Sequence, residues 1–302
     1  MTSPTPTVPR RALFLLIALT LVWGTNWPLF PYAVREVSVW TFRGVAMTGA
    51  GLSLLLFARL RRQPLAIPRR YWKTIALATF FYLVIWNVTS TYAAILIPSG
   101  QAAVLGFTMP LWGALIAWAV LGERLGLRLL LAVALGGVGV TLLMVPGFAA
   151  YAAAPTGFAL GLLSAIGWAI GTMILKRGNV LVPVMVLTGW QLLLGAIPIS
   201  IVAFAVADTP WFIPSWQSIA VIAWITLIPM SIGNVCWFAI VGLLPANIAG
   251  LSSVMVPVVA MVSGAIVHGE PLGPLQLTSM AACVAALVLA LGQKTRPQKL
   301  EG

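Results

Sequence analysis

The chain has 302 residues, of which 61% are hydrophobic and only 7% are charged, and its formal net charge is +12. A soluble globular domain carries about 25% charged residues, so this composition excludes a soluble fold. The basic residues lie between apolar segments or at the chain ends, which argues against a nucleic-acid partner and for the positive-inside rule of membrane proteins. With only two cysteines, Cys236 and Cys283, a disulfide-rich secreted scaffold is also excluded.

Ten apolar segments follow one another along the chain, and each is long enough to cross a bilayer as a helix of ~20 residues. In chain order they cover residues 12–32, 38–58, 74–96, 101–121, 127–146, 157–175, 182–206, 217–240, 248–267 and 274–292. Most connections between them are short and carry glycine, proline or charge. The sequence therefore predicts an all-α integral membrane protein with ten transmembrane helices.

The basic residues are unevenly distributed over the connections. With the N-terminus in the cytoplasm, 15 of the 17 Lys and Arg residues fall on the cytoplasmic side, and only Arg35 and Arg43 remain. Such an excess of Lys and Arg marks cytoplasmic loops. We therefore expect a multi-pass protein of the cell inner (plasma) membrane, in contact with membrane lipid and with both termini in the cytoplasm.

The two halves of the chain align at a constant offset of 147 positions. The offset pairs Asn87 with Asn234, Pro98 with Pro245, Pro110 with Pro257 and Gly122-Glu123 with Gly269-Glu270. Chance matches of Leu, Ala and Val are common in this composition, whereas matches of Asn, Pro and Gly-Glu at one offset are not. Each repeat holds five segments, an odd number, so the second repeat must enter the membrane in the opposite sense.

Inverted repeats are typical of secondary transporters, whose substrate sites lie near the bilayer midplane where the repeats meet. The alternative is a duplicated scaffold without a transport pathway. The predicted organisation has four parts: a cytoplasmic N-terminal tail (1–11), a first repeat of five transmembrane helices (12–146), a second, inverted repeat of five (157–292) and a cytoplasmic C-terminal tail (293–302).

Two five-helix halves, each with an Asn, two Pro and a Gly-Glu in fixed order, resemble the EamA branch of the drug/metabolite transporter superfamily. Within that branch the chain is similar to the bacterial aromatic amino-acid exporter group. The most specific part of the resemblance is a Pro-x12-Glu pattern, which runs from Pro110 to Glu123 and again from Pro257 to Glu270. The resemblance covers about residues 12 to 292 and implies a ten-helix inner-membrane carrier that moves amino acids or related metabolites outward.

Pro110 and Pro257 lie inside the fourth and ninth predicted helices. A proline removes one backbone hydrogen bond and kinks the helix, which here would free the carbonyls of Gly106 and Ser253. In lipid, freed carbonyls need protein, water or a ligand. The two prolines are therefore candidate hinges of bent helices that line the cavity, or else kinks of shape that neighbouring hydroxyls repair.

Polar side chains inside the apolar segments are candidates for substrate binding. Arg43 is the one clearly intramembrane charge, and it can either attract a substrate carboxylate or anchor its helix at the outer interface. The matching region of the second half holds Gln191, whose amide suits a zwitterion because it both donates and accepts. Asn87 and Asn234 are expected either to clamp neighbouring helices together or to contact the substrate.

Thirteen Trp residues are many for this length. An indole N–H within the membrane needs an acceptor, which favours a position facing a cavity or another helix. An aromatic cavity would hold aromatic or aliphatic side chains and, by cation–π contact, an amino group. Ordinary packing is the alternative for each ring. The aromatic candidates for the cavity are Trp23, Tyr82, Trp86, Trp168 and Trp237.

The sequence has no ATP-binding phosphate loop, no metal-ligand cluster and no convergent nucleophile and base, so we expect neither an enzyme nor a cofactor or metal site. No Asp or Glu lies deep within a predicted helix. Proton-coupled carriers place a carboxylate or His in the pathway, so we expect weak or absent proton coupling, or coupling through a terminal group such as Glu270 or His268.

The sequence thus predicts a secondary transporter that exports amino acids, aromatic and other neutral ones with broad specificity, by alternating access. Its partners would be a small-molecule substrate and membrane lipid, with no nucleic acid, and a monomer is compatible with the architecture. Export of another small metabolite or of a drug is the alternative. A channel, an intramembrane enzyme and a nucleotide-sugar carrier fit less well, since the last would need several cations at depth where only Arg43 is available.

Overall fold

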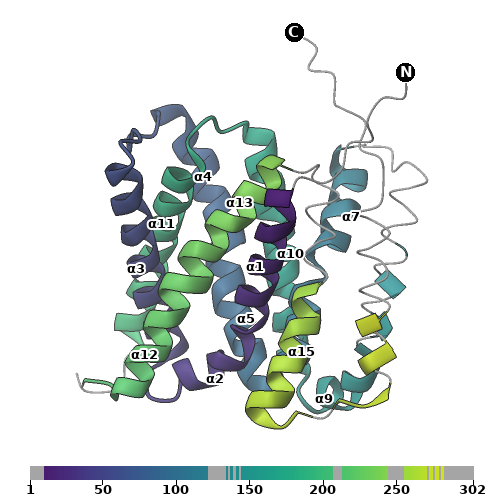
Figure 1. The fold of residues 1–302 in the computed structure, drawn as a ribbon. Coiled ribbons are helices and arrows are strands. Elements are labelled where there is room, and N and C mark those ends of the chain that lie inside the picture. Colours follow the sequence, from purple (N-terminus) through teal and green to yellow (C-terminus); the bar gives the residue numbers. More distant parts are fainter. Residues whose placement is uncertain are drawn as a thin grey trace, which may run out of the picture.

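The computed structural model describes residues 10–121, 134, 137–138, 141–142, 144–206, 213–243, 255–270, 272–274, 276–278 and 280–281. Within these ranges the regular structure consists of helices, with no strand. The helices stand side by side in a bundle (Figure 1). For the described part of the chain, the predicted all-helical membrane fold is therefore confirmed.

Six helical segments are long and apolar enough to cross a membrane: Arg10–Ala33, Val39–Leu60, Arg69–Leu96, Pro155–Gly178, Val184–Ala205 and Trp216–Trp237. Their elements are α1 (Arg10–Gly24), η1 (Trp27–Leu29) and α2 (Phe30–Ala33); α3 (Val39–Leu60); η2 (Arg69–Tyr71), α4 (Trp72–Thr79), η3 (Phe80–Ile85) and α5 (Trp86–Leu96); α10 (Pro155–Gly178); α11 (Val184–Ala205); and α12 (Trp216–Ile225), η5 (Thr226–Gly233) and α13 (Asn234–Leu243). All six overlap segments expected from the sequence.

Of the other four expected spans, the fourth is described completely and the remaining three only in part. The fourth is not one continuous helix, because α6 (Ser99–Gly106) and α7 (Met109–Leu121) are separated at Phe107 and Thr108. Of the ninth, the structure describes α15 (Met255–His268). Of 127–146 and 274–292, only single residues or short pieces are described. The first of these two segments ends at η4 (Val145–Gly147), which α9 (Phe148–Ala153) follows. Ten transmembrane helices therefore remain a prediction.

Two of the spans contain π-helical turns at corresponding places in the repeat. The segment η3 begins at Phe80, and η5 begins at Thr226, one residue before the position 147 further along. Each π-helix is a widened stretch inside an otherwise α-helical span, a feature often found at functional sites. The two spans run in opposite directions through the bundle, from α4 to α5 and from α12 to α13 (Figure 1).

The helices of the two halves pack against each other. In the first half, α1 packs against α13 and α15, whereas in the second half α10 packs against α5, η3 and α7. The α3 and α11 helices approach closely where Gly51 meets Gly189, since a Cβ at Gly51 would lie 2.9 Å from the Gly189 carbonyl oxygen. Such small residues let membrane helices approach closely. Helices of the two halves therefore pack directly against each other throughout the described bundle.

The two ends of the bundle differ in chemistry. The start of α1, the α3–α4 connection and the α10–α11 connection lie at one end (Figure 1), and these segments carry basic residues such as Arg10, Arg61 and Lys176. At the other end, hydrogen bonds tie distant segments together. Glu36 accepts from the Ser215 backbone N–H (2.7 Å), and His268 Nε2 pairs with the Pro28 carbonyl (2.8 Å). We call this second end the closed end.

Candidate functional site

A cavity lies near the middle of the bundle, between elements of both halves. It encloses about 540 Å³ of space, a figure that includes open solvent at its mouth. The first half contributes Trp23, Asn26, Trp27, Phe30, Arg43, Leu83, Trp86, Asn87, Ser90 and Phe107, and the second half contributes Trp168, Pro229, Met230 and Asn234. A cavity built from both halves is where a transporter with internal repeats places its substrate.

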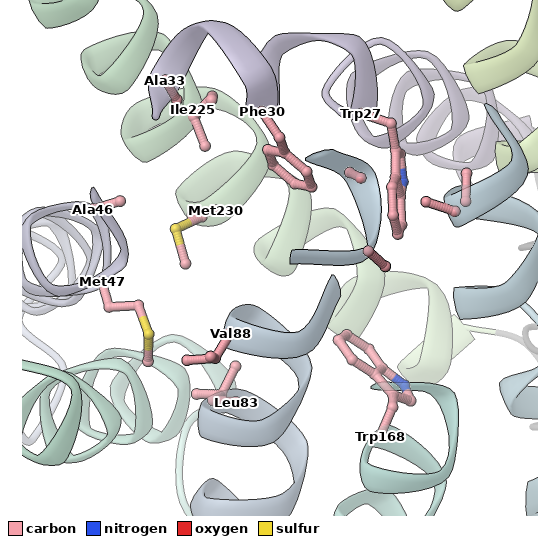
Figure 2. Close-up of a cluster of buried hydrophobic side chains, with 14 of the residues drawn as sticks. Trp27, Phe30, Ala33, Ala46, Met47, Leu83, Val88, Trp168, Ile225 and Met230 are labelled. Atoms are coloured by element: carbon pink, nitrogen blue, oxygen red, sulfur yellow. The ribbon is translucent and has the colours of Figure 1, made fainter. Parts of the chain in front are cut away.

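Aromatic rings form most of its wall. The ring centroid of Trp86 lies 4.7 Å from that of Trp168 and 6.2 Å from that of Trp27, and both ring pairs are arranged edge to face. Trp23 continues the cluster with an edge-to-face contact to Trp168 at 5.9 Å. In Figure 2, Trp27 and Trp168 reach toward the same region from helices on opposite sides of the view. Edge-to-face pairs fix ring orientation, so the wall is preorganised.

Arg43 is the one charged residue among those that line the cavity. It lies in the second turn of α3, its side chain is only 2% exposed, and its Nε donates to Thr91 Oγ1 at 2.6 Å. The guanidinium also lies over the rings of Phe30 and Phe42, at 4.4 and 4.7 Å. This burial argues against the alternative in which Arg43 reaches the outer interface as an anchor.

Asn87 and Asn234 make the same hydrogen bond in the two halves. The side-chain amide of Asn87 donates to the Leu83 carbonyl at 2.8 Å, and that of Asn234 donates to the Met230 carbonyl at 2.6 Å. Both acceptors lie in the π-helical turn of the donor's own span. The expected clamp between neighbouring helices is therefore not what these bonds form. Each amide instead satisfies a carbonyl of its own widened turn, and both residues line the cavity.

The cavity wall also joins the halves directly. Trp23 Nε1 donates to the Pro229 carbonyl at 3.1 Å, which gives the indole of α1 an acceptor in η5. Gly233 makes this approach possible, because a Cβ there would overlap Trp23 Nε1. The expectation that an indole within the membrane finds an acceptor holds for Trp23. The sequence analysis did not single out Pro229 or Gly233.

The structure brings six of the nine expected substrate-binding residues to the cavity: Trp23, Arg43, Trp86, Asn87, Trp168 and Asn234. The other three lie outside its lining. Tyr82 is buried behind the wall against Trp168, at 4.3 Å, and Trp237 packs against Trp23 at 5.7 Å. Gln191 is fully buried within the packing of α11, and its two amide atoms have no partner among the described residues.

Four lining residues that the sequence analysis missed have a recognisable spacing. Trp27 and Phe30 follow Trp23 by four and seven positions, and Leu83 and Ser90 bracket Asn87 by four and three. Residues three, four and seven apart share one face of a helix. This spacing, applied around the intramembrane Asn and Trp, would have found them.

The two expected hinge prolines have different settings. Pro110 is the second residue of α7 and follows the interruption at Phe107 and Thr108. Pro257 lies in the first turn described for α15 and is buried. Its expected free carbonyl, that of Ser253, lies outside the described residues. Glu123, the first-half partner of Glu270, also lies outside them.

Possible metal ligands form no cluster in the part of the chain that the structure describes. There, no group of three or more His, Cys, Asp and Glu residues comes together. A helical bundle that crosses the membrane repeatedly and holds an aromatic and polar cavity between its halves defines the class of multi-pass membrane transporters.

Comparison with known proteins gives the family. The EamA-like transporter family matches twice, over residues 10–145 and 155–292, and the chain belongs to this family. A crystal structure of a protein with 20% sequence identity superposes with a TM-score of 0.71 and covers 95% of this chain and 99% of the other, which shows the same fold.

Curated relatives are named as transporters. The chain is 25% identical to the uncharacterized transporter YvbV of Bacillus subtilis, over 96% of this chain and 94% of the relative. It is 24% identical to a probable amino-acid metabolite efflux pump of Salmonella typhimurium, over 93% and 94%. It is 27% identical to the uncharacterized inner membrane transporter YedA of Escherichia coli, over 94% of this chain and 92% of the relative.

Proposed function

We propose that this protein exports amino acids, aromatic and other neutral ones, across the inner membrane by alternating access. The observation that carries the proposal is the cavity, because residues from both halves of an EamA-like transporter meet there around aromatic rings and a few polar groups. The substrate would bind at Trp23, Arg43, Trp86, Asn87, Trp168 and Asn234. A relative named as an amino-acid metabolite efflux pump supports this choice of substrate.

The amide oxygens of the cavity suit the ammonium group of an amino acid. The Oδ1 atoms of Asn26 and Asn234 are buried and accept no hydrogen bond from any described residue. A buried acceptor without a donor is costly, and an ammonium brings three donors and a positive charge. The surrounding Trp and Phe rings would add cation–π attraction and apolar contact for the side chain.

In the proposed mechanism of alternating access, the two ends of the bundle open in turn. We place the basic end in the cytoplasm with both termini, by the positive-inside rule, and the closed end at the outer face. The second repeat is then inverted, consistent with the opposite directions of α4–α5 and α12–α13 (Figure 1). Export requires that contacts at the closed end break while the cytoplasmic end closes, with Pro110 and Pro257 as hinges.

Export of another apolar metabolite or of a drug is the second candidate, because aromatic walls also bind planar apolar compounds. To distinguish the two, the full chain is reconstituted into liposomes loaded with a labelled compound, and efflux is compared for phenylalanine, leucine, lysine and a hydrophobic cationic drug. Faster efflux of phenylalanine and leucine than from protein-free liposomes supports the proposal. Efflux of the drug alone would replace amino-acid export by drug export.

A further inference from the structure

Among the residues that the structure describes, the charge of Arg43 has no counter-charge. The structure describes two acidic residues, Glu36 and Glu270, and both form hydrogen bonds at the closed end, with Ser215 and Ser99. Within the described residues, the one side-chain hydrogen bond of Arg43 goes to the neutral hydroxyl of Thr91. A buried charge in hydrocarbon is costly unless it is paired. No described residue of the cavity wall therefore neutralises the charge of Arg43.

The contacts of Arg43 fix its direction without neutralising it. Thr91 Oγ1 donates its own hydrogen to the Asn87 carbonyl at 2.7 Å, so its oxygen is left to accept from Arg43 Nε. The rings of Phe30 and Phe42 lie within 4.7 Å of the guanidinium carbon. A guanidinium has five N–H donors, and Thr91 takes only one. The remaining donors belong to a residue that lines the cavity.

The opposite repeat does not duplicate this group. The position 147 residues after Arg43 is Trp190, whose Nε1 donates to the Leu65 carbonyl at 2.8 Å, and it does not line the cavity. Among its described lining residues, the cavity therefore has one cationic side chain. Its planar fork matches the two oxygens of a carboxylate, which it can bind with two parallel hydrogen bonds.

We infer that Arg43 and Thr91 form a carboxylate subsite and that the transported species must carry a free carboxylate, which supplies the missing counter-charge. Arg43 binds the carboxylate, and Thr91 is a positioning residue. This inference rests on the proposed function, since it assigns the carboxyl end of the substrate in the same cavity. Amides, esters and amines of the same shape are then excluded, whereas a carboxylate without an amino group still binds.

Competition against efflux of labelled phenylalanine tests the inference on the wild-type protein. We expect 3-phenylpropionate, which lacks the ammonium, to inhibit, and phenylalaninamide and phenylethylamine, which lack the carboxylate, to inhibit at least tenfold more weakly. Equal inhibition by phenylalanine and phenylalaninamide would overturn the inference while leaving amino-acid export standing. Transport of 3-phenylpropionate without transport of any amino acid would refute the proposed function and support the subsite.

Variants and a binding assay complete the test. Arg43→Gln should weaken the binding of phenylalanine on the order of 10- to 100-fold, the loss expected for a charge-assisted hydrogen bond. Inhibition by phenylalaninamide should be unchanged in this variant. Arg43→Lys should restore part of the affinity, and Arg35→Gln, at an exposed loop position, should behave as wild type.

Thermal stabilisation of wild-type protein in detergent gives a readout independent of transport. An increase in melting temperature with 3-phenylpropionate supports the subsite. The inference is overturned if chloride alone raises the melting temperature or if no carboxylate does.

Discussion

The carboxylate of Glu270 caps the helix that begins at Ser99. One oxygen accepts hydrogen bonds from the Ser99 backbone N–H at 3.0 Å and from its hydroxyl at 2.8 Å. The first backbone N–H groups of a helix have no partner within the helix and carry partial positive charge, so an anion there is favourable. Since Glu270 belongs to the second half and Ser99 to the first, this cap holds the halves together at the closed end.

Glu270→Ala should destabilise the closed end. An N-cap contributes about 1 kcal/mol and the helix dipole about 0.3–1 kcal/mol, so we expect a loss of about 1–2 kcal/mol of unfolding free energy in detergent. A double-mutant cycle with Ser99→Ala isolates the interaction, because the two losses should be less than additive. Fully additive losses would mean that the Ser99 hydroxyl and the Glu270 carboxylate do not stabilise each other.

Acidification should loosen a second contact of the closed end. Ser215 donates to Glu36 from its hydroxyl at 2.5 Å and its backbone N–H at 2.7 Å, and these bonds lower the pKa of Glu36 from 4.5. A carboxyl whose pKa is lower in the folded protein adds stability above its unfolded pKa and loses it as the pH falls through the folded pKa. The melting temperature should therefore decrease as the pH is lowered below 4.5.

Ser215→Ala provides the matched comparison for this pH effect. The variant keeps the backbone donor but loses the hydroxyl, the first cause of the lowered pKa of Glu36. Its melting temperature should be lower than that of wild type at neutral pH and should depend less on pH in the acidic range. Identical pH profiles for the two proteins would show that Glu36 does not couple to folding.

Gly171→Ala should disrupt the contact between α10 and the first half. A Cβ at Gly171 would overlap Tyr82, and the Tyr82 backbone nitrogen and Ala78 carbonyl would lie within 2.8 Å, so backbone must move. Overpacking of this kind costs about 1–3 kcal/mol. Gly113→Ala is the control, since a Cβ at Gly113 meets nothing within 4 Å. We expect the control to melt at or above the wild-type temperature and Gly171→Ala to melt below it.

Trp86→Ala should raise the KM for aromatic substrates. The substitution removes a ring that contacts Trp27, Phe107 and Trp168 and lines the cavity. Stacking contacts contribute about 0.5–1.5 kcal/mol beyond burial, so a rise of roughly tenfold is expected for phenylalanine, with a smaller rise for Trp86→Phe. Trp216→Ala, at a position that is 73% exposed, should leave KM unchanged. A rise of equal size in both variants would place substrate binding elsewhere.

The repeat and the apolar runs carry most of what the sequence predicts correctly. The length of the apolar segments alone locates the six described spans, because the lipid-facing surface of a membrane-spanning helix must be apolar over ~20 residues. The constant offset predicts that Asn87 and Asn234 occupy equivalent places, and their identical hydrogen bonds to Leu83 and Met230 agree with it.

Two expected lining residues lie elsewhere, for reasons that residue type alone does not show. Tyr82 and Leu83 are neighbours in η3, and Leu83, which is four residues before Asn87, is the one that lines the cavity. Gln191 was chosen for its closeness to the position equivalent to Arg43, but one step along a helix turns a side chain by about 100°. The residue at the equivalent position is Trp190.

Alternating access through the cavity is tested most directly by trans-stimulation. Proteoliposomes that contain the full chain are loaded with labelled phenylalanine, and its efflux is followed with and without unlabelled phenylalanine outside. A carrier returns faster with substrate bound than empty, so we predict that external phenylalanine accelerates efflux several-fold. An efflux rate that does not respond to external substrate would indicate a channel and contradict the account.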